Sequence, residues 1–339
     1  MSNILVLGGT SFYGRNLVEK LLKEGHKVTF FARGTNKSVE SELISQGAVP
    51  IHGDRKDVGS FKDLFESQTE IYDAILDNTA MNGEDVKCVL ETLGAKTRHY
   101  ILCSSAAVYP DWDRLTPYRE EEADLDYVSV TPDDRTDVKK RIANYANGKR
   151  EAEKVLLSYA ATIPFTILRP AVIEGPNDPT GRTWYWVQRL EQNIPVILPS
   201  SPFMPLARHV YVKDLVDFAY AVISNSPKNK AYNVVGDETI SLDAYLNMIH
   251  STLLGAEEKS SLTIVSVDKE IVQTKLQRFP AFFDHSLLLD NSAAKADYDF
   301  KPTPISEWLP ETVFWASKNC ALPEGSKDLY AEELRSASL

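Results

Sequence analysis

Two short stretches of the chain carry residue types at spacings that could do chemistry. The stretch GGTSFYG, residues 8–14, is a glycine-rich turn between an apolar run and an amphipathic one. In such a turn the backbone can approach the phosphates of a dinucleotide, and the helix that follows adds N–H donors and a favourable dipole. The stretch NYANGKREAEKVLL, residues 144–157, places Tyr145 and Lys149 four residues apart, on one face of a helix. This pair is either part of an enzyme active site or two ordinary surface residues.

The glycine turn departs from the usual fingerprint at one position. Gly8 and Gly14 hold the outer positions of a G-x-x-G-x-x-G pattern, and Ser11 stands where the middle glycine is expected. The Ser11 hydroxyl could donate to a phosphate or crowd its approach, and the glycines could serve turn geometry alone. Because the turn opens a βαβ unit, we predict that it binds a dinucleotide cofactor. The cofactor residues predicted from this turn are Gly8, Thr10, Ser11, Phe12, Tyr13 and Gly14.

The residues after the second and third predicted strands bear on the identity of the nucleotide. An acidic residue after the second strand would hold the ribose hydroxyls of NAD(H) and repel a 2′-phosphate. Ala32 occupies that position, Arg33 follows it and Lys37 is close behind. Because this position has no carboxylate and an arginine follows it, the sequence favours NADP(H), with NAD(H) as the alternative. The other interpretation is that Arg33 is only a solvent-exposed residue at the end of the strand. Asp54, after the third strand, is placed to hydrogen-bond an adenine amino group, and Arg55 beside it joins the predicted cofactor site.

The elements that must position these residues alternate along the first half of the chain. Short apolar runs predict strands at 3–9, 27–33, 48–54, 72–80, 98–105 and 164–173, and amphipathic patterns predict helices at 14–26, 60–67, 84–94 and 144–160. This alternation is typical of a parallel sheet covered on both faces, a doubly wound Rossmann-type α/β fold. We predict a nucleotide-binding core over 1–168, with segments near 206–236 returning to it, and a smaller mixed α/β substrate lobe over 169–339.

Composition narrows the class of protein. The 339 residues are 43% hydrophobic, enough for a large core, and the formal charge is −11. An acidic chain repels phosphate backbones, so nucleic-acid binding is disfavoured. Three dispersed cysteines and six dispersed histidines show no metal-ligand spacing, so no metal site is expected. The sequence has neither a signal-peptide pattern nor an apolar run long enough for a membrane span. These features predict a soluble cytoplasmic protein without a membrane partner.

A family resemblance appears once Ser105, in CSSAAVYP, is placed between the glycine turn and the Tyr145–Lys149 pair. The chain resembles the extended short-chain dehydrogenase/reductase superfamily, and within it the NAD-dependent epimerase/dehydratase group. The stretches that follow the family order are NILVLGGTSFYGRNLVEKLLKEGHKVTFFARG, YANGKREAEKVL, TILRPAVIEGPNDP and RHVYVKDLVDF. Each motif is modest alone, and their ordered combination carries the resemblance.

The resemblance implies roles for the matching residues. Tyr145 would be the acid/base for a substrate hydroxyl or carbonyl oxygen, and Ser105 would hydrogen-bond that oxygen. The ammonium of Lys149 would assist the phenol and hold the nicotinamide ribose. The residues implied to line the cofactor cleft are Thr79, Pro170 and Val172. Homodimerisation through the helices at 84–94 and 144–160 is a further implication.

We therefore expect an NAD(P)-dependent reductase, dehydrogenase or epimerase that acts on a small molecule or a sugar nucleotide. The substrate stays open, because Arg208 stands one position later than the pyrophosphate-binding arginine of sugar-nucleotide enzymes. On an extended segment such a shift turns the side chain to the other face. Two alternatives remain, both without catalysis. One is RNA binding, known among relatives with a similarly altered glycine turn, and the other is NADP sensing.

Overall fold

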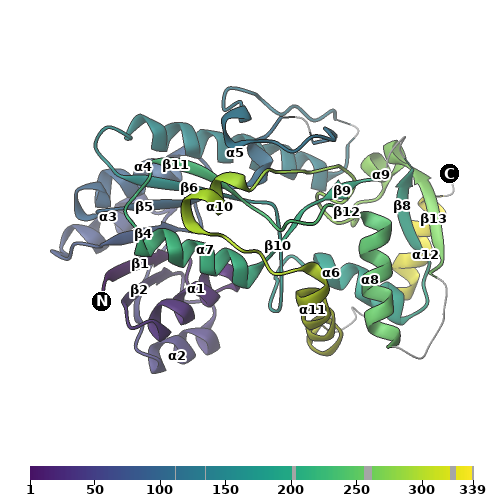
Figure 1. Ribbon diagram of the computed structural model, residues 1–339, viewed down its shortest axis with the longest axis horizontal. Helices are drawn as coiled ribbons and strands as arrows, with labels where there is room; N and C mark the ends of the chain where they lie inside the picture. The colour runs from purple at the N-terminus through teal and green to yellow at the C-terminus, as the bar shows by residue number, and fades with distance from the viewer. Residues whose placement is uncertain (111, 134, 201–203, 256–261, 321–325, 338–339) are drawn as a thin grey trace.

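The protein is described here by a computed structural model, which covers residues 1–110, 112–133, 135–200, 204–255, 262–320 and 326–337. Seven parallel strands form the central sheet in the order β11-β6-β5-β4-β1-β2-β3 (Figure 1). The strands are β1 (Asn3–Leu7), β2 (Lys27–Ala32), β3 (Val49–His52), β4 (Ala74–Asp77), β5 (Tyr100–Cys103), β6 (Phe165–Pro170) and β11 (Lys230–Val234). The doubly wound Rossmann-type fold predicted from the sequence is confirmed.

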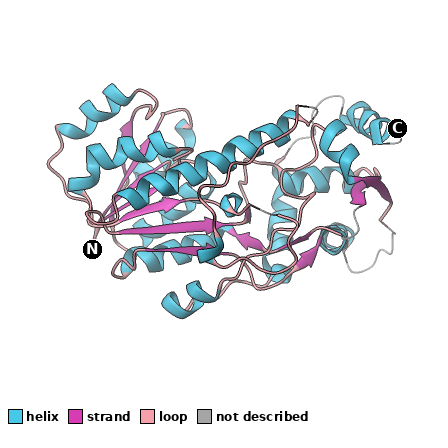
Figure 2. Cartoon of the chain, turned by 90° about the horizontal axis from the view of Figure 1, so that it is seen from above, coloured by secondary structure: helices cyan, strands magenta, loops and turns pink. Residues whose placement is uncertain are grey.

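Helices cover both faces of this sheet (Figures 1 and 2). One layer holds α1 (Phe12–Lys23), α2 (Lys37–Ser45) and α7 (Val212–Ser224), and the other holds α3 (Val58–Glu66), α4 (Gly83–Leu93) and α5 (Asp137–Ser158). Successive side chains of a strand point to opposite faces, so Ile4 and Val6 of β1 join the core beneath α1 and α7. Leu5 and Leu7 join the core beneath α3, α4 and α5. Strands buried on both sides explain the continuous apolar runs.

A second group of elements follows β6. Its helices are α6 (Arg182–Glu191), α8 (Leu242–Leu254), α9 (Lys269–Lys275), α10 (Ser292–Tyr298), α11 (Ile305–Asn319) and α12 (Ser326–Ala337). Its strands pair as β7 (Val172–Glu174) with β10 (His209–Tyr211), β8 (Val196–Ser200) with β13 (Ile264–Asp268), and β9 (Leu206–Ala207) with β12 (Ile240–Ser241). The run predicted as one strand at 164–173 is therefore two, because after Pro170 the chain leaves the main sheet and pairs with β10.

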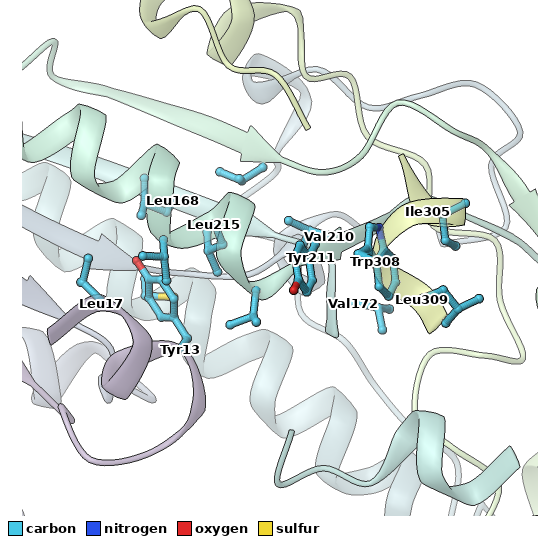
Figure 3. Packing of buried hydrophobic residues seen from close by; sticks show 14 of the residues in the cluster. Tyr13, Leu17, Leu168, Val172, Val210, Tyr211, Leu215, Ile305, Trp308 and Leu309 are labelled. Atoms are coloured by element: carbon cyan, nitrogen blue, oxygen red, sulfur yellow. The ribbon is translucent and has the colours of Figure 1, made fainter. Parts of the chain in front are cut away.

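One apolar core joins the sheet to the later elements (Figure 3). It runs from Tyr13 and Leu17 of α1, past Val172, to Trp308 of α11. Tyr211 and Trp308 stack with ring centroids 5.6 Å apart. No helix in the described parts of the chain is long and apolar enough to cross a membrane. The cytoplasmic location and the homodimer stay predictions.

Candidate functional site

Helix α5 holds Tyr145 and Lys149 at the carboxyl edge of the sheet. The Lys149 ammonium donates to the carbonyl oxygens of Ala80, after β4, and Cys103, at the end of β5, each at 2.8 Å. Its nitrogen lies 5.6 Å from the centroid of the Tyr145 ring. A lysine ammonium has three N–H donors, so one remains for a ligand. Lys149 is buried, and Tyr145 is partly exposed.

Glycine at position 148 lets α5 approach this edge closely. A Cβ there would stand 2.2 Å from the carbonyl oxygen of Met81, in the segment between β4 and α4. Glycine in a helix interior costs about 1 kcal/mol relative to alanine. The close approach accounts for that cost, since it brings the Lys149 ammonium within hydrogen-bond reach of the neighbouring Ala80 carbonyl.

Ser105 follows β5 and faces the same place. Its hydroxyl oxygen accepts from the Ala107 N–H at 3.1 Å, which leaves the hydroxyl proton free to be donated. Ser105, Tyr145 and Lys149 line one cavity of about 220 Å³. Other residues that line it are Phe12, Asn78, Met81, Pro170, Val172, Arg182 and Phe282. The structure thus brings the three predicted catalytic side chains together, with Phe12, Pro170 and Val172 of the predicted cofactor set.

Arg150, to which no sequence motif pointed, stabilises the segment that follows Ser105. It is 1% exposed, and its guanidinium donates to the carbonyl oxygens of Val108 at 2.8 Å and Ala107 at 3.2 Å. These carbonyls belong to the short 3-10 helix Ala106–Val108 directly after Ser105. Burial lowers the pKa of the Arg150 guanidinium. An arginine beside a Tyr-x-x-x-Lys pair gives no sequence signal for this role, which depends on a turn 42 to 43 residues away.

The glycine turn packs so closely that two of its positions have no room for a side chain. Gly8 has φ +88°, and a Cβ on it would stand 2.3 Å from the Thr79 methyl carbon. A Cβ on Gly14 would stand 1.9 Å from the Gly8 carbonyl oxygen, so both glycines are needed for close packing. Ser11 is exposed and makes no side-chain capping hydrogen bond to α1. The first N–H groups of α1 therefore lack a side-chain cap, as an anion site at a helix start requires.

Three further predicted cofactor residues lie at the carboxyl ends of neighbouring strands. Arg33 follows β2, Lys37 begins α2, and Asp54 follows β3. All three are exposed. The Arg33 and Lys37 side chains make no hydrogen bond or ion pair with any residue that the structure describes. Asp54 accepts from the Lys56 N–H at 2.9 Å and retains acceptor capacity. The strand ends thus present two unpaired cations and one carboxylate.

Tyr13 and Arg55, predicted as cofactor residues, turn their side chains into the protein. Tyr13 is 2% exposed and lies in the core beside Leu17 (Figure 3). Its hydroxyl has no hydrogen-bond partner among the described residues, and burial raises its pKa well above the usual value. The helical period of α1 places Tyr13 and Leu17 on the same inward face. Its side chain is therefore not available to a ligand in the cleft.

Arg55 forms a buried ion pair beneath the glycine turn. It donates to both carboxylate oxygens of Asp77, at 2.7 and 2.8 Å, and to the Thr79 hydroxyl at 2.7 Å. Tyr100 donates to the same carboxylate at 2.7 Å. The Arg55 charge and these hydrogen bonds outweigh burial, so the pKa of Asp77 lies below its usual value. Arg55 and Thr79 thus support the turn from below, and no sequence motif pointed to Asp77 as the partner of Arg55.

Several residues of the cavity, among them Asn78 and Arg182, were not predicted from the sequence. Asn78 directly follows β4, and the rule that carboxyl ends of parallel strands share one edge could have found it. Arg182 and Phe282 reach the cavity from α6 and from the loop after α9. They carry no local motif, because only the packing of the later elements brings them to the sheet edge.

Comparison with known proteins identifies the family. The model of the NAD dependent epimerase/dehydratase family matches residues 4–235. The chain belongs to this family. The chloroplast stem-loop binding protein of 41 kDa b of Arabidopsis thaliana is 32% identical over 250 residues, which cover 71% of this chain and 60% of the plant protein. The 2-alkyl-3-oxoalkanoate reductase of Shewanella oneidensis is 23% identical over 336 residues, covering 88% of this chain and 82% of that protein.

Solved structures share the fold of this family member. The dTDP-glucose 4,6-dehydratase of Bacillus anthracis, in complex with NAD, has a TM-score of 0.72 at 18% identity, covering 97% of this chain and 100% of the other. The UDP-glucuronic acid 4-epimerase of Bacillus cereus, in complex with NAD, has a TM-score of 0.70 at 17% identity, covering 93% and 99%. At these identities the similarity concerns the fold and leaves the substrate open.

Proposed function

We propose that the protein is an NAD(P)-dependent oxidoreductase or epimerase acting on a hydroxyl or carbonyl carbon. The observation that carries the proposal is the single cavity lined by Ser105, Tyr145 and Lys149. The Tyr145 hydroxyl has no hydrogen-bond partner among the described residues, so it is free to exchange a proton with a substrate oxygen. Ser105, with its hydroxyl proton unused, would hydrogen-bond the same oxygen and fix its position. A bound nicotinamide would supply hydride transfer at the adjoining carbon.

We propose that the glycine turn, Arg33, Lys37 and Asp54 hold the dinucleotide. The uncapped start of α1 fits the pyrophosphate, and Asp54 fits the adenine amino group. Two unpaired cations after β2 fit a 2′-phosphate, which favours NADP(H) over NAD(H). Calorimetric titration of wild type and Arg33→Ala with both oxidised cofactors tests this. We expect tighter binding of NADP⁺ by wild type and a fall to the NAD⁺ affinity in the variant. Equal wild-type affinities would refute the preference.

Tyr145→Phe tests the catalytic role. We expect cofactor affinity to be kept, and turnover to fall by about 10²-fold or more, because a positioned acid/base contributes that much. The substrate panel follows from the relatives: 2-alkyl-3-oxo acids with reduced cofactor, and UDP- and dTDP-sugars with oxidised cofactor. Turnover that survives in Tyr145→Phe would remove the assignment.

RNA binding is a second candidate, favoured by the 32% identity to the chloroplast stem-loop binding protein. The formal charge of −11 opposes it. Gel-shift titration with a stem-loop RNA at two salt concentrations tests it. Salt-sensitive binding that persists in Tyr145→Phe would support this candidate, and absence of a shift would eliminate it.

A further inference from the structure

Met81 is an exposed methionine in the wall of the catalytic cavity, the cavity that Ser105, Tyr145 and Lys149 line. It belongs to the segment between β4 and α4 and is 47% exposed. Its N–H donates to the Asp85 carboxylate at 2.8 Å, and its carbonyl oxygen lies against Gly148 of α5. A methionine side chain is unbranched and has three rotatable bonds. Met81 therefore carries a flexible thioether on a fixed backbone at the proposed active site.

The other methionines differ from Met81 in exposure or in place. Met204 and Met248 are partly buried against the main apolar core. Met1 is fully exposed, but it precedes β1 and so lies at the amino edge of the sheet, away from the cavity. Of the four methionines, all of which the structure describes, Met81 is the exposed one at the catalytic cavity.

The cysteine of the same cavity is a poor target for oxidants. Cys103 is 6% exposed, and burial raises the pKa of its thiol to about 11 against the opposing effect of the Lys149 charge. Burial also raises the pKa of the Cys88 and Cys320 thiols. Peroxides attack the thiolate, which is scarce at neutral pH when the pKa is raised. A thioether has no proton to lose, so the exposure of Met81 alone decides how readily it is oxidised.

We propose that Met81 is a reversible oxidation site that controls ligand binding in the catalytic cavity. Hydrogen peroxide transfers one oxygen atom to the sulfur, so that the O–O bond breaks and an S–O bond forms. The thioether loses two electrons and becomes a sulfoxide, and the peroxide is reduced to water. Methionine sulfoxide reductases return the sulfoxide to the thioether, which makes the change reversible.

Oxidation of Met81 changes what Lys149 can bind. Two of the three N–H groups of the ammonium donate to the carbonyl oxygens of Ala80 and Cys103, and the third remains for a ligand. Met81 directly follows Ala80, and its sulfoxide oxygen would be a new acceptor in the same cavity. This acceptor competes for the third N–H and makes an apolar part of the wall polar. The effect rests on the proposed function, which places a bound nicotinamide in this cavity.

Mass spectrometry after timed exposure of the wild-type protein to hydrogen peroxide tests the modification itself. The sulfoxide fraction of each methionine-containing peptide is followed, together with the state of the three cysteines. We expect Met81 to be oxidised about tenfold or more faster than Met204 and Met248, because exposure governs access of the oxidant. The cysteines should still be thiols when Met81 has reacted. Oxidation of Met81 no faster than that of Met248, or a cysteine that reacts first, would overturn the proposal.

Calorimetric titration with NADP⁺ and NAD⁺ tests the consequence. Wild type, Met81→Leu and the control Met248→Leu are each titrated untreated, after peroxide, and after peroxide followed by methionine sulfoxide reductases A and B. Leucine keeps a similar apolar volume and has no sulfur to oxidise.

We expect peroxide to weaken cofactor binding by wild type and Met248→Leu about tenfold, as the loss of a hydrogen bond to a charged group allows, and the reductases to restore it. Met81→Leu should bind equally before and after peroxide. An equal loss in Met81→Leu, or no loss in fully oxidised wild type, would overturn the control of binding. Untreated wild type that binds neither cofactor would count against the proposed function and against this control, and the order of methionine oxidation would still decide whether Met81 is the oxidation site.

Discussion

Replacement of Gly148 by alanine is the sharpest test of how the site is built. On helix propensity alone, Gly148→Ala in the interior of α5 should stabilise the protein by about 1 kcal/mol. The structure predicts the opposite sign. The new Cβ would stand 2.2 Å from the Met81 carbonyl oxygen, where ordinary contact begins at 3.4 Å. Backbone cannot swing aside, so α5 must shift. Overpacking of this kind costs about 1–3 kcal/mol, so after the propensity gain of about 1 kcal/mol we expect a net loss of about 1 kcal/mol.

Urea unfolding measures this change, with Gly59→Ala as the matched control. Gly59 lies in α3, and a Cβ there would meet no atom nearer than an Asp57 carboxylate oxygen at 3.7 Å. Gly59→Ala should leave stability unchanged or raise it by up to about 1 kcal/mol. Because Lys149 donates to the carbonyl of Ala80, the residue before Met81, Gly148→Ala should also weaken cofactor binding in calorimetry. A Gly148→Ala protein as stable as wild type, with unchanged cofactor affinity, would show that the close approach of α5 is wrong.

Three further substitutions test buried polar groups. Tyr13→Phe removes a buried hydroxyl without a described partner and should raise the unfolding free energy by about 1 kcal/mol in urea, whereas a loss would reveal a hydrogen bond. Arg55→Met leaves the Asp77 carboxylate buried and unpaired, and it should lower the unfolding free energy by about 3–5 kcal/mol. As a control, Arg98→Met breaks an exposed ion pair and should lower it by at most about 1 kcal/mol. Similar losses for the two variants would refute this contrast. Burial lowers the pKa of His99 from 6.5 to about 4, so the unfolded chain binds the proton first as pH falls. Stability should therefore drop by about 3 kcal/mol between pH 6.5 and 4, and His99→Asn should remove that part of the pH dependence in urea titrations at each pH.

The sequence predicted the strands of the central sheet well and the elements that follow β6 only in part. Strands β1 to β6 lie within the predicted runs. All of them except the edge strand β3 are apolar stretches buried on both faces, a pattern that can be recognised without knowing the neighbouring strands. The helices α9 to α12 were not predicted. Their apolar residues, such as Trp308 of α11, are buried by contacts with distant segments, here Tyr211 of β10. Local periodicity is weak where burial is decided by such long-range packing.

The candidate site divides in the same way. Ser105, Tyr145 and Lys149 could be predicted from their types and order. Ser105 follows a strand, and the carboxyl ends of parallel strands share one edge of the sheet. Tyr145 and Lys149 lie one helical turn apart, so they share one face of the helix. Even so, spacing could not distinguish Tyr13, which faces the core, from Phe12, which lines the cavity, although the two are neighbours in one motif.

What the sequence by itself determined is the Rossmann-type sheet, the glycine turn at its carboxyl edge and the Tyr145–Lys149 pair on one helix face. These depend on contacts within a few residues or on the handedness of βαβ units. Only the tertiary structure decided that Arg55 pairs with Asp77, that Arg150 donates to the turn after Ser105, and that Arg182 reaches the catalytic cavity from α6. The physical reason is that a buried charge is defined by the partners that surround it, and those partners come from elements far apart in the chain.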